Sequence, residues 1–125
     1  MGQASALKLA CNAWIAMLTA GTAQSLGIAA SLGVDPSLFL QVIEGGAVDT
    51  PYAHVKGDAM LAGDWTTSFA VDGLRKDMDL MVEATREDGF PQEMLTSVLG
   101  LFDNVSEQGH GSEDIAAVRT AFPTR

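Results

Sequence analysis

The chain has 125 residues, a formal net charge of −9 and one cysteine. This length suits a single domain with its own core, and a lone cysteine allows no internal disulfide, which favours a reducing, cytoplasmic location. The excess of 16 acidic over 7 basic residues argues against a nucleic-acid-binding protein, because phosphate binding requires a basic face.

The first predicted element is a long helix over residues 4–31. Apolar side chains recur in it at steps of three and four residues, which places them on one face of a helix. These residues are Leu7, Cys11, Trp14 and Leu18. We expect this stripe to pack in the core, with a subunit interface as the alternative for Trp14.

Residues 9–34 contain no charged side chain and are long enough to span a bilayer. Polar residues are spread through this segment, however, and Ala and Gly outnumber the large aliphatic residues that drive membrane insertion. We therefore expect a helix buried in protein and no membrane partner. Such a helix, with few partners in its own chain, indicates a second subunit or domain.

The remaining predicted elements are shorter helices separated by glycine and proline, and Gly33 is expected to end the first helix. Two of them cover residues 36–44 and 51–61. Another begins at the candidate caps Thr67 and Ser68 and runs to residue 88, and one more covers residues 91–105. A short last helix runs from the cap Ser112 to Val118. Asp35 is the expected cap of the second, and Gly57 weakens the third. Strand alternation is almost absent. The prediction is one all-α domain of about five to six helices around a long central first helix.

Lys8 and Asn12 are the first candidate functional residues, one helical turn apart on the same face. Ser5, Ala16 and Thr19 continue that face with small side chains that leave room for a ligand or a second domain. A poorly solvated lysine gives up its proton more readily and can serve in proton transfer, and the asparagine can orient a substrate. A solvated lysine near a helix start is the alternative, and the spacing alone favours it.

Phe69 and Lys76 form a second candidate pair, in which an aromatic ring at a helix start precedes a cation two turns further on. They could meet a flat ligand and a phosphate or carboxamide. The alternative is core packing for Phe69 and a solvated helix face for Arg75 and Lys76. The His, Cys and Asp residues show no spacing typical of a metal site, so no metal is predicted.

Five segments together resemble the C-terminal domain of 3-hydroxyisobutyrate dehydrogenase and its β-hydroxyacid dehydrogenase relatives. The first, over residues 2–12, resembles the family pattern Gly-x(5)-Lys-x(3)-Asn. The others lie in the family's order at residues 32–36, 60–69, 74–80 and 109–117. The resemblance covers essentially the whole chain and implies the helical fold seen in 6-phosphogluconate dehydrogenase-like proteins.

The resemblance also implies an activity: the NAD(P)-dependent interconversion of a small β-hydroxyacid and its oxo acid or semialdehyde. The residue matching Lys8 would be the general acid/base and the one matching Asn12 would hold the substrate. Lys76 would approach the NAD or NADP cofactor, and Phe69 would lie near its nicotinamide. The family's helical domain supplies much of a dimer contact, so a homodimer is expected.

The chain contains no Gly-x-Gly-x-x-Gly loop of a dinucleotide-binding domain. We therefore expect residues 1–125 to be the C-terminal half of a two-domain enzyme, with the Rossmann domain upstream and absent, and the isolated chain to be inactive. The alternative is a stand-alone helical binding or dimerisation module without catalysis.

Overall fold

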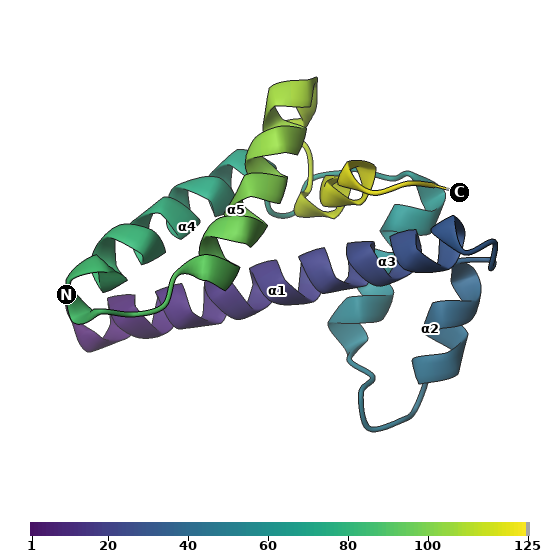
Figure 1. Ribbon diagram of the computed structural model, residues 1–125, viewed down its shortest axis with the longest axis horizontal. Coiled ribbons are helices and arrows are strands. Elements are labelled where there is room, and N and C mark those ends of the chain that lie inside the picture. The colour runs from purple at the N-terminus through teal and green to yellow at the C-terminus, as the bar shows by residue number, and fades with distance from the viewer. Residues whose placement is uncertain (125) are drawn as a thin grey trace.

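A computed structural model describes residues 1–124 as helices packed around one long helix (Figure 1). The α-helices are α1 (Gln3–Ser31), α2 (Ser37–Ile43), α3 (Pro51–Ala62), α4 (Val71–Thr85) and α5 (Glu93–Val105). Three short helical turns complete the fold: η1 (Arg86–Asp88), η2 (Ser106–His110) and η3 (Ile115–Ala121). Residues 1–124 contain no strand beyond an isolated bridge between Ala70 and Asp114. The all-α prediction is confirmed.

Helix α1 is the spine of the domain and contacts α2, α3, α4, α5 and η3. In Figure 1, α4 and α5 lie over its N-terminal half and η3 along its C-terminal half. The core forms where these elements meet. Its largest fully buried side chains are Phe102, Leu26, Leu74, Met78 and Ile115.

The face of α1 that enters the core is not the predicted one. The buried face carries mostly small residues, namely Ala16, Thr19, Ala20, Thr22, Ala23, Leu26, Gly27 and Ala30. In contrast, Leu7 is 57% and Trp14 61% exposed, and Cys11 is exposed as well. The core assignment of Cys11 and Trp14 is therefore wrong for this chain. Small side chains allow the neighbouring helices to approach α1 closely, whereas Leu7 and Trp14 remain outside.

The ends of the first three helices follow local signals. Gly33 has a φ of +79° and ends α1 as predicted. The Asp35 carboxylate accepts a hydrogen bond from the Ser37 N–H at 3.0 Å, at the start of α2. Gly57 does not interrupt α3, although it weakens helices in general. It lies against helix α2, where there is no room for a side chain. A Cβ at position 57 would be 2.8 Å from Leu40 Cδ1.

The start of α4 was predicted less well. Helix α4 begins at Val71, and neither Thr67 nor Ser68 caps it. The Thr67 hydroxyl donates to the carbonyl of Ser112, and the Ser68 hydroxyl donates to Asp114. Both side chains thus connect to the end of the chain. Ser112 is not a cap either, because Asp114 caps η3 by accepting the Ala116 N–H at 2.9 Å.

Asp114 is the centre of a buried polar cluster that joins α3, the start of α4 and η3. Its Oδ2 accepts a hydrogen bond from Lys56 Nζ at 2.8 Å, and both side chains are almost fully buried. Its Oδ1 accepts hydrogen bonds from the N–H groups of Ser68 and Phe69 at 3.1 Å. The carboxylate therefore fixes the segment that leads into α4.

This cluster predicts a specific loss of stability in acid. Burial raises the pKa of Asp114, but the hydrogen bonds from Lys56 and the backbone N–H groups outweigh it and lower the pKa from 3.8 to about 2. A carboxyl whose folded pKa is depressed stabilises the fold above its unfolded pKa, and this contribution disappears as the pH falls through the folded pKa. We expect a loss on the order of 2 kcal/mol between about pH 4 and about pH 2.

Urea unfolding across this pH range measures the loss. The comparison is Asp114→Asn, which keeps the side-chain shape but has no proton to gain. The difference in free energy of unfolding between the two proteins should shrink as the pH falls through the window. A difference that stays constant would contradict the assignment.

By length and composition α1 could cross a membrane, and it is the one helix within residues 1–124 that meets this criterion. Of its most apolar 18-residue window, 44% is buried inside the chain. The core helices of soluble proteins meet the same criterion. The expectation of a helix buried in protein therefore stands as a prediction.

Candidate functional site

Lys8 and Asn12 lie on the extension of the face that α1 buries further along. Positions 8, 12, 19, 23 and 26 are separated by three, four or seven residues, so they share one side of the helix. Thr19, Ala23 and Leu26 are buried by the other helices, whereas Lys8 is exposed and Asn12 is half-buried. The core-facing side of α1 therefore continues toward the N-terminus past the elements that cover it.

Asn12 connects this part of α1 to α4. Its Nδ2 donates a hydrogen bond to Asp77 Oδ2 at 2.7 Å. The side-chain nitrogen must face Asp77, because an ionised carboxylate can only accept. The bond thus fixes the amide orientation and leaves the carbonyl oxygen and the second N–H of Asn12 for an incoming substrate.

The candidate residues of α4 lie along the same edge as Asp77. Gly73, Lys76 and Asp77 lie on one side of α4 at steps of three and one, and Phe69, which precedes the helix, has its ring next to Gly73. Phe69 is half-buried and packs against the core, as the alternative interpretation expected, and Lys76 is exposed. The fold therefore brings Asn12 against Asp77, with Lys8 one turn before Asn12 on α1, Lys76 next to Asp77 on α4, and Phe69 just ahead of α4.

Lys8 and Lys76 differ from the other exposed or ion-paired cations of the described residues, and the buried Arg119 bonds to the Phe122 carbonyl instead of a carboxylate. Lys56, Arg75 and Arg86 each form an ion pair. Lys8 and Lys76 form none with any residue of the described range 1–124. In a chain with a net charge of −9, two exposed cations without carboxylate partners on adjoining helix edges suit an anionic ligand.

Two expectations about the surroundings of these residues are corrected. Ala16 and Thr19 were expected to leave room for a ligand, but both are fully buried against other helices of the same chain. Arg75 does not lie on a simple solvated face. It donates to Asp103 at 2.7 Å and to Asp72 at 2.9 Å, and so ties α4 to α5.

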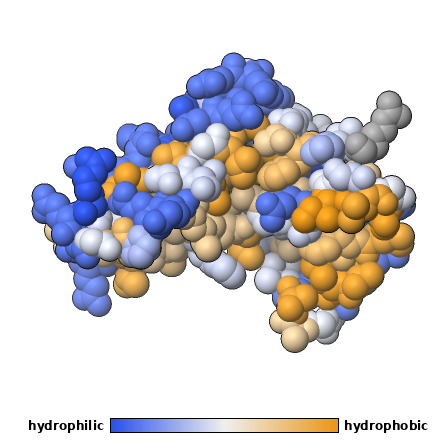
Figure 2. Space-filling view, viewed as in Figure 1, coloured by the Kyte–Doolittle hydropathy of each residue, from blue (hydrophilic) through white to orange (hydrophobic). Residues whose placement is uncertain are grey.

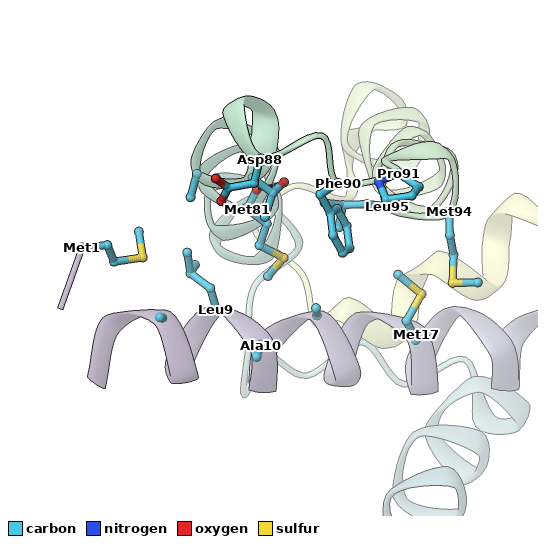
Figure 3. A pocket seen from close by; sticks show the side chains of 14 residues that line it. Met1, Leu9, Ala10, Met17, Met81, Asp88, Phe90, Pro91, Met94 and Leu95 are labelled. Atoms are coloured by element: carbon cyan, nitrogen blue, oxygen red, sulfur yellow. Dashed lines mark hydrogen bonds between the residues drawn. The ribbon is translucent and has the colours of Figure 1, made fainter. Parts of the chain in front are cut away.

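A large cavity lies elsewhere, between the N-terminal half of α1, the end of α4 and the start of α5 (Figure 3). It has a volume of about 530 Å³ and a mostly apolar lining that includes Met1, Met17, Met81, Met94 and Phe90. None of the four predicted site residues lines it. Leu9 and Ala13 follow Lys8 and Asn12 in sequence but face this cavity, because a step of one residue turns the side chain by about 100°.

Asp77 is the site residue that sequence reasoning missed. It belongs to the Lys-Asp pair at 76–77, yet only Lys76 received a role. The four-residue spacing between Gly73 and Asp77 places both on one edge of α4. The hydrogen bond between Asp77 and Asn12 spans 65 positions, however, and leaves no pattern in the local sequence. Within residues 1–124, no group of three or more His, Cys, Asp and Glu side chains is arranged as metal ligands.

Comparison with known proteins gives a consistent result. The family described as "NAD-binding of NADP-dependent 3-hydroxyisobutyrate dehydrogenase" matches residues 2–122. An L-threonate dehydrogenase of Cupriavidus necator is 29% identical over 98% of this chain and 41% of its own length. A chloroplastic glyoxylate/succinic semialdehyde reductase 2 of Arabidopsis thaliana is 25% identical over 98% of this chain and 34% of its own length.

The solved structures that match have the same fold. A 3-hydroxyisobutyrate dehydrogenase from Salmonella typhimurium superposes with a TM-score of 0.86 at 25% identity, over 94% of this chain and 41% of that one. This chain thus spans about two fifths of the length of the relatives that it matches.

Proposed function

Because this chain belongs to the 3-hydroxyisobutyrate dehydrogenase family, we propose that it is the catalytic-lysine domain of an NAD(P)-dependent oxidoreductase acting on a small β-hydroxyacid. The rest of the enzyme would be a dinucleotide-binding Rossmann domain, in keeping with the two fifths of its relatives' length that this chain covers. The observation that carries the proposal is the Asn12–Asp77 bond, which joins the helix turn of Lys8 to the edge of Phe69 and Lys76.

Lys8 would act on the substrate's reacting oxygen. In the oxidation its Nζ takes the proton from the hydroxyl group, and in the reduction it returns a proton to the carbonyl oxygen. Asn12 would orient the same substrate, since Asp77 already holds its amide in one direction. When bound, the nicotinamide cofactor would accept or supply the hydride. The carboxylate of the hydroxyacid would suit the exposed cation Lys76.

The residues present fit one end of such a cofactor. Phe69 offers a half-buried ring just ahead of α4, and Lys76 is an exposed cation within that helix. The chain has no glycine-rich phosphate loop, so it could contact the nicotinamide but not hold the whole dinucleotide. Catalysis would need both domains to hold the reacting groups in one geometry, and the isolated chain is therefore expected to be inactive. The single exposed thiol, Cys11, supports a reducing, cytoplasmic location.

The alternative function is a helical binding or dimerisation module without catalysis. The exposed Trp14 and the apolar residues over α2 favour it, but it gives no account of Lys8 and Lys76 at one edge.

An absorbance assay of NADH and NADPH formation tests the proposal. It would compare this chain with a full-length protein containing it, across a panel of small β-hydroxyacids. Turnover by the full-length protein alone is expected. Inactivity of both with every substrate would favour the binding module, and turnover by the isolated chain would contradict the requirement for a second domain.

A homodimer is part of the proposal. Hydrophobic side chains gather over α2 and the adjoining end of α1 (Figure 2). A hollow between α1 and the α2–α3 loop continues this surface and is lined by Trp14, Leu18, Ile43 and Val48 among others. Contiguous exposed apolar surface of this kind is typical of protein interfaces, and an exposed tryptophan is a frequent hot spot.

We expect the chain to sediment as a dimer and Trp14→Glu to raise the dimer dissociation constant by roughly 30-fold or more, the cost of losing one hot-spot side chain. Analytical ultracentrifugation measures this. Leu80→Glu is the control, because Leu80 is also an exposed apolar residue, at 48%, but lies on α4 and lines neither this hollow nor the cavity of Figure 3. A wild-type chain that stays monomeric at high concentration would contradict the dimer.

A further inference from the structure

Gly73 occupies an unfavourable place for a glycine, the first half of helix α4, where it weakens the helix relative to alanine. Its neighbour explains the glycine. A Cβ at position 73 would be 3.3 Å from Phe69 Cε1 and 3.7 Å from Phe69 Cδ1. The first distance is tighter than ordinary van der Waals contact, so the ring would have to move by a few tenths of an ångström.

The main chain of Phe69 cannot follow such a movement easily. Its N–H donates to Asp114 Oδ1 at 3.1 Å, and its carbonyl accepts the Ile115 N–H at 2.9 Å. Asp114 is itself buried and held by Lys56. A side chain at position 73 would therefore turn the Phe69 ring about a fixed backbone.

We propose that Gly73 is a positioning residue for the cofactor end of the site, because it sets the orientation of the Phe69 ring. This inference rests on the proposed function, in which the nicotinamide lies near Phe69. Gly73 touches no ligand in this scheme and acts through the aromatic ring alone. The structure thus assigns a role to a small residue that neither composition nor charge would single out.

The test uses the full-length protein and the dissociation constants of NADH and NADPH, measured by fluorescence titration. Gly73→Ala should weaken binding of the preferred cofactor roughly threefold to tenfold, which is about the worth of one aromatic ring contact. The KM for that cofactor should rise in parallel while kcat changes less. The thermal midpoint should not fall, because alanine favours the helix.

Gly100→Ala is the matched control. Gly100 also lies inside a helix, α5, and is exposed, with no atom within 4 Å of its virtual Cβ. It receives the same gain in helix propensity without touching a ring. An equal weakening of cofactor binding by Gly100→Ala would overturn the proposal, because the effect would then be one of helix stiffness.

The decisive measurement places Gly73→Ala in a Phe69→Leu background. If Gly73 acts through the ring, the alanine should no longer change the dissociation constant there. A persistent effect in that background, or unchanged binding by Gly73→Ala alone, overturns the positioning role and leaves the proposed function intact. A wild-type full-length protein that binds neither NADH nor NADPH overturns the proposed function and the inference together.

Discussion

Replacement of Lys8 by alanine in the full-length protein is expected to lower kcat by about 100-fold to 10,000-fold, the range that a positioned acid/base supplies. The fold should be unaffected, because Lys8 is exposed and forms no ion pair within residues 1–124. Binding of the cofactor should change little. Steady-state rates, with circular dichroism to confirm the fold, measure the effect.

Small primary amines added to Lys8→Ala provide a chemical control. If the lysine transfers a proton, an amine that diffuses into the vacated space should restore part of the rate and leave the wild-type rate unchanged. Arg86→Ala removes another exposed cation, which pairs with Glu83 on the surface and has no role in the proposed site, and should have no effect on turnover. A Lys8→Ala protein with a rate near that of the wild type would refute the assignment.

The second large effect concerns stability. Asp114→Ala is expected to lower the free energy of unfolding by about 3–5 kcal/mol, because Lys56 would keep a buried charge without a partner. The variant would also leave the N–H groups of Ser68, Phe69 and Ala116 without their acceptor. Chemical denaturation of the isolated chain would show the loss.

An exposed ion pair serves as the comparison. Arg86 and Glu83 are 3.1 Å apart with side chains 62% and 70% exposed. Surface pairs of this kind contribute at most about 1 kcal/mol, so Arg86→Ala should hardly change the denaturation midpoint. Equal effects of Asp114→Ala and Arg86→Ala would show that the buried cluster does not have the importance assigned to it.

The helices could be predicted from sequence because their ends are marked locally. Gly33, Gly63 and Gly89 all adopt the left-handed conformation where helices were expected to stop. Thr67 and Ser68 misled the prediction because they resemble caps, yet their hydroxyl groups bond to residues about 45 positions away. A cap motif shows that a side chain can form a hydrogen bond at a helix start, but it does not show which of two available partners the side chain will bind.

The prediction of which face of α1 is buried failed for a different reason. Hydrophobic periodicity identifies a buried face by contrast with a polar one, and residues 9–34 have no charges to provide it. The larger residues, such as Trp14, therefore appeared to mark the core. At the site, the spacing of Lys8 and Asn12 was visible in the sequence, but their connection to Asp77 depends on how two helices cross.

The arrangement of η3 against α1 has a consequence during synthesis. The residues of η3, which pack along the C-terminal half of α1, lie at positions 115–121 and are thus translated about 90 residues after it. At 5–20 residues per second, this interval lasts roughly 5–20 s. During that time α2 and α3 can already pack against α1, but the side that η3 covers stays open, so the nascent chain should be a substrate for chaperones on the ribosome until its last segment emerges.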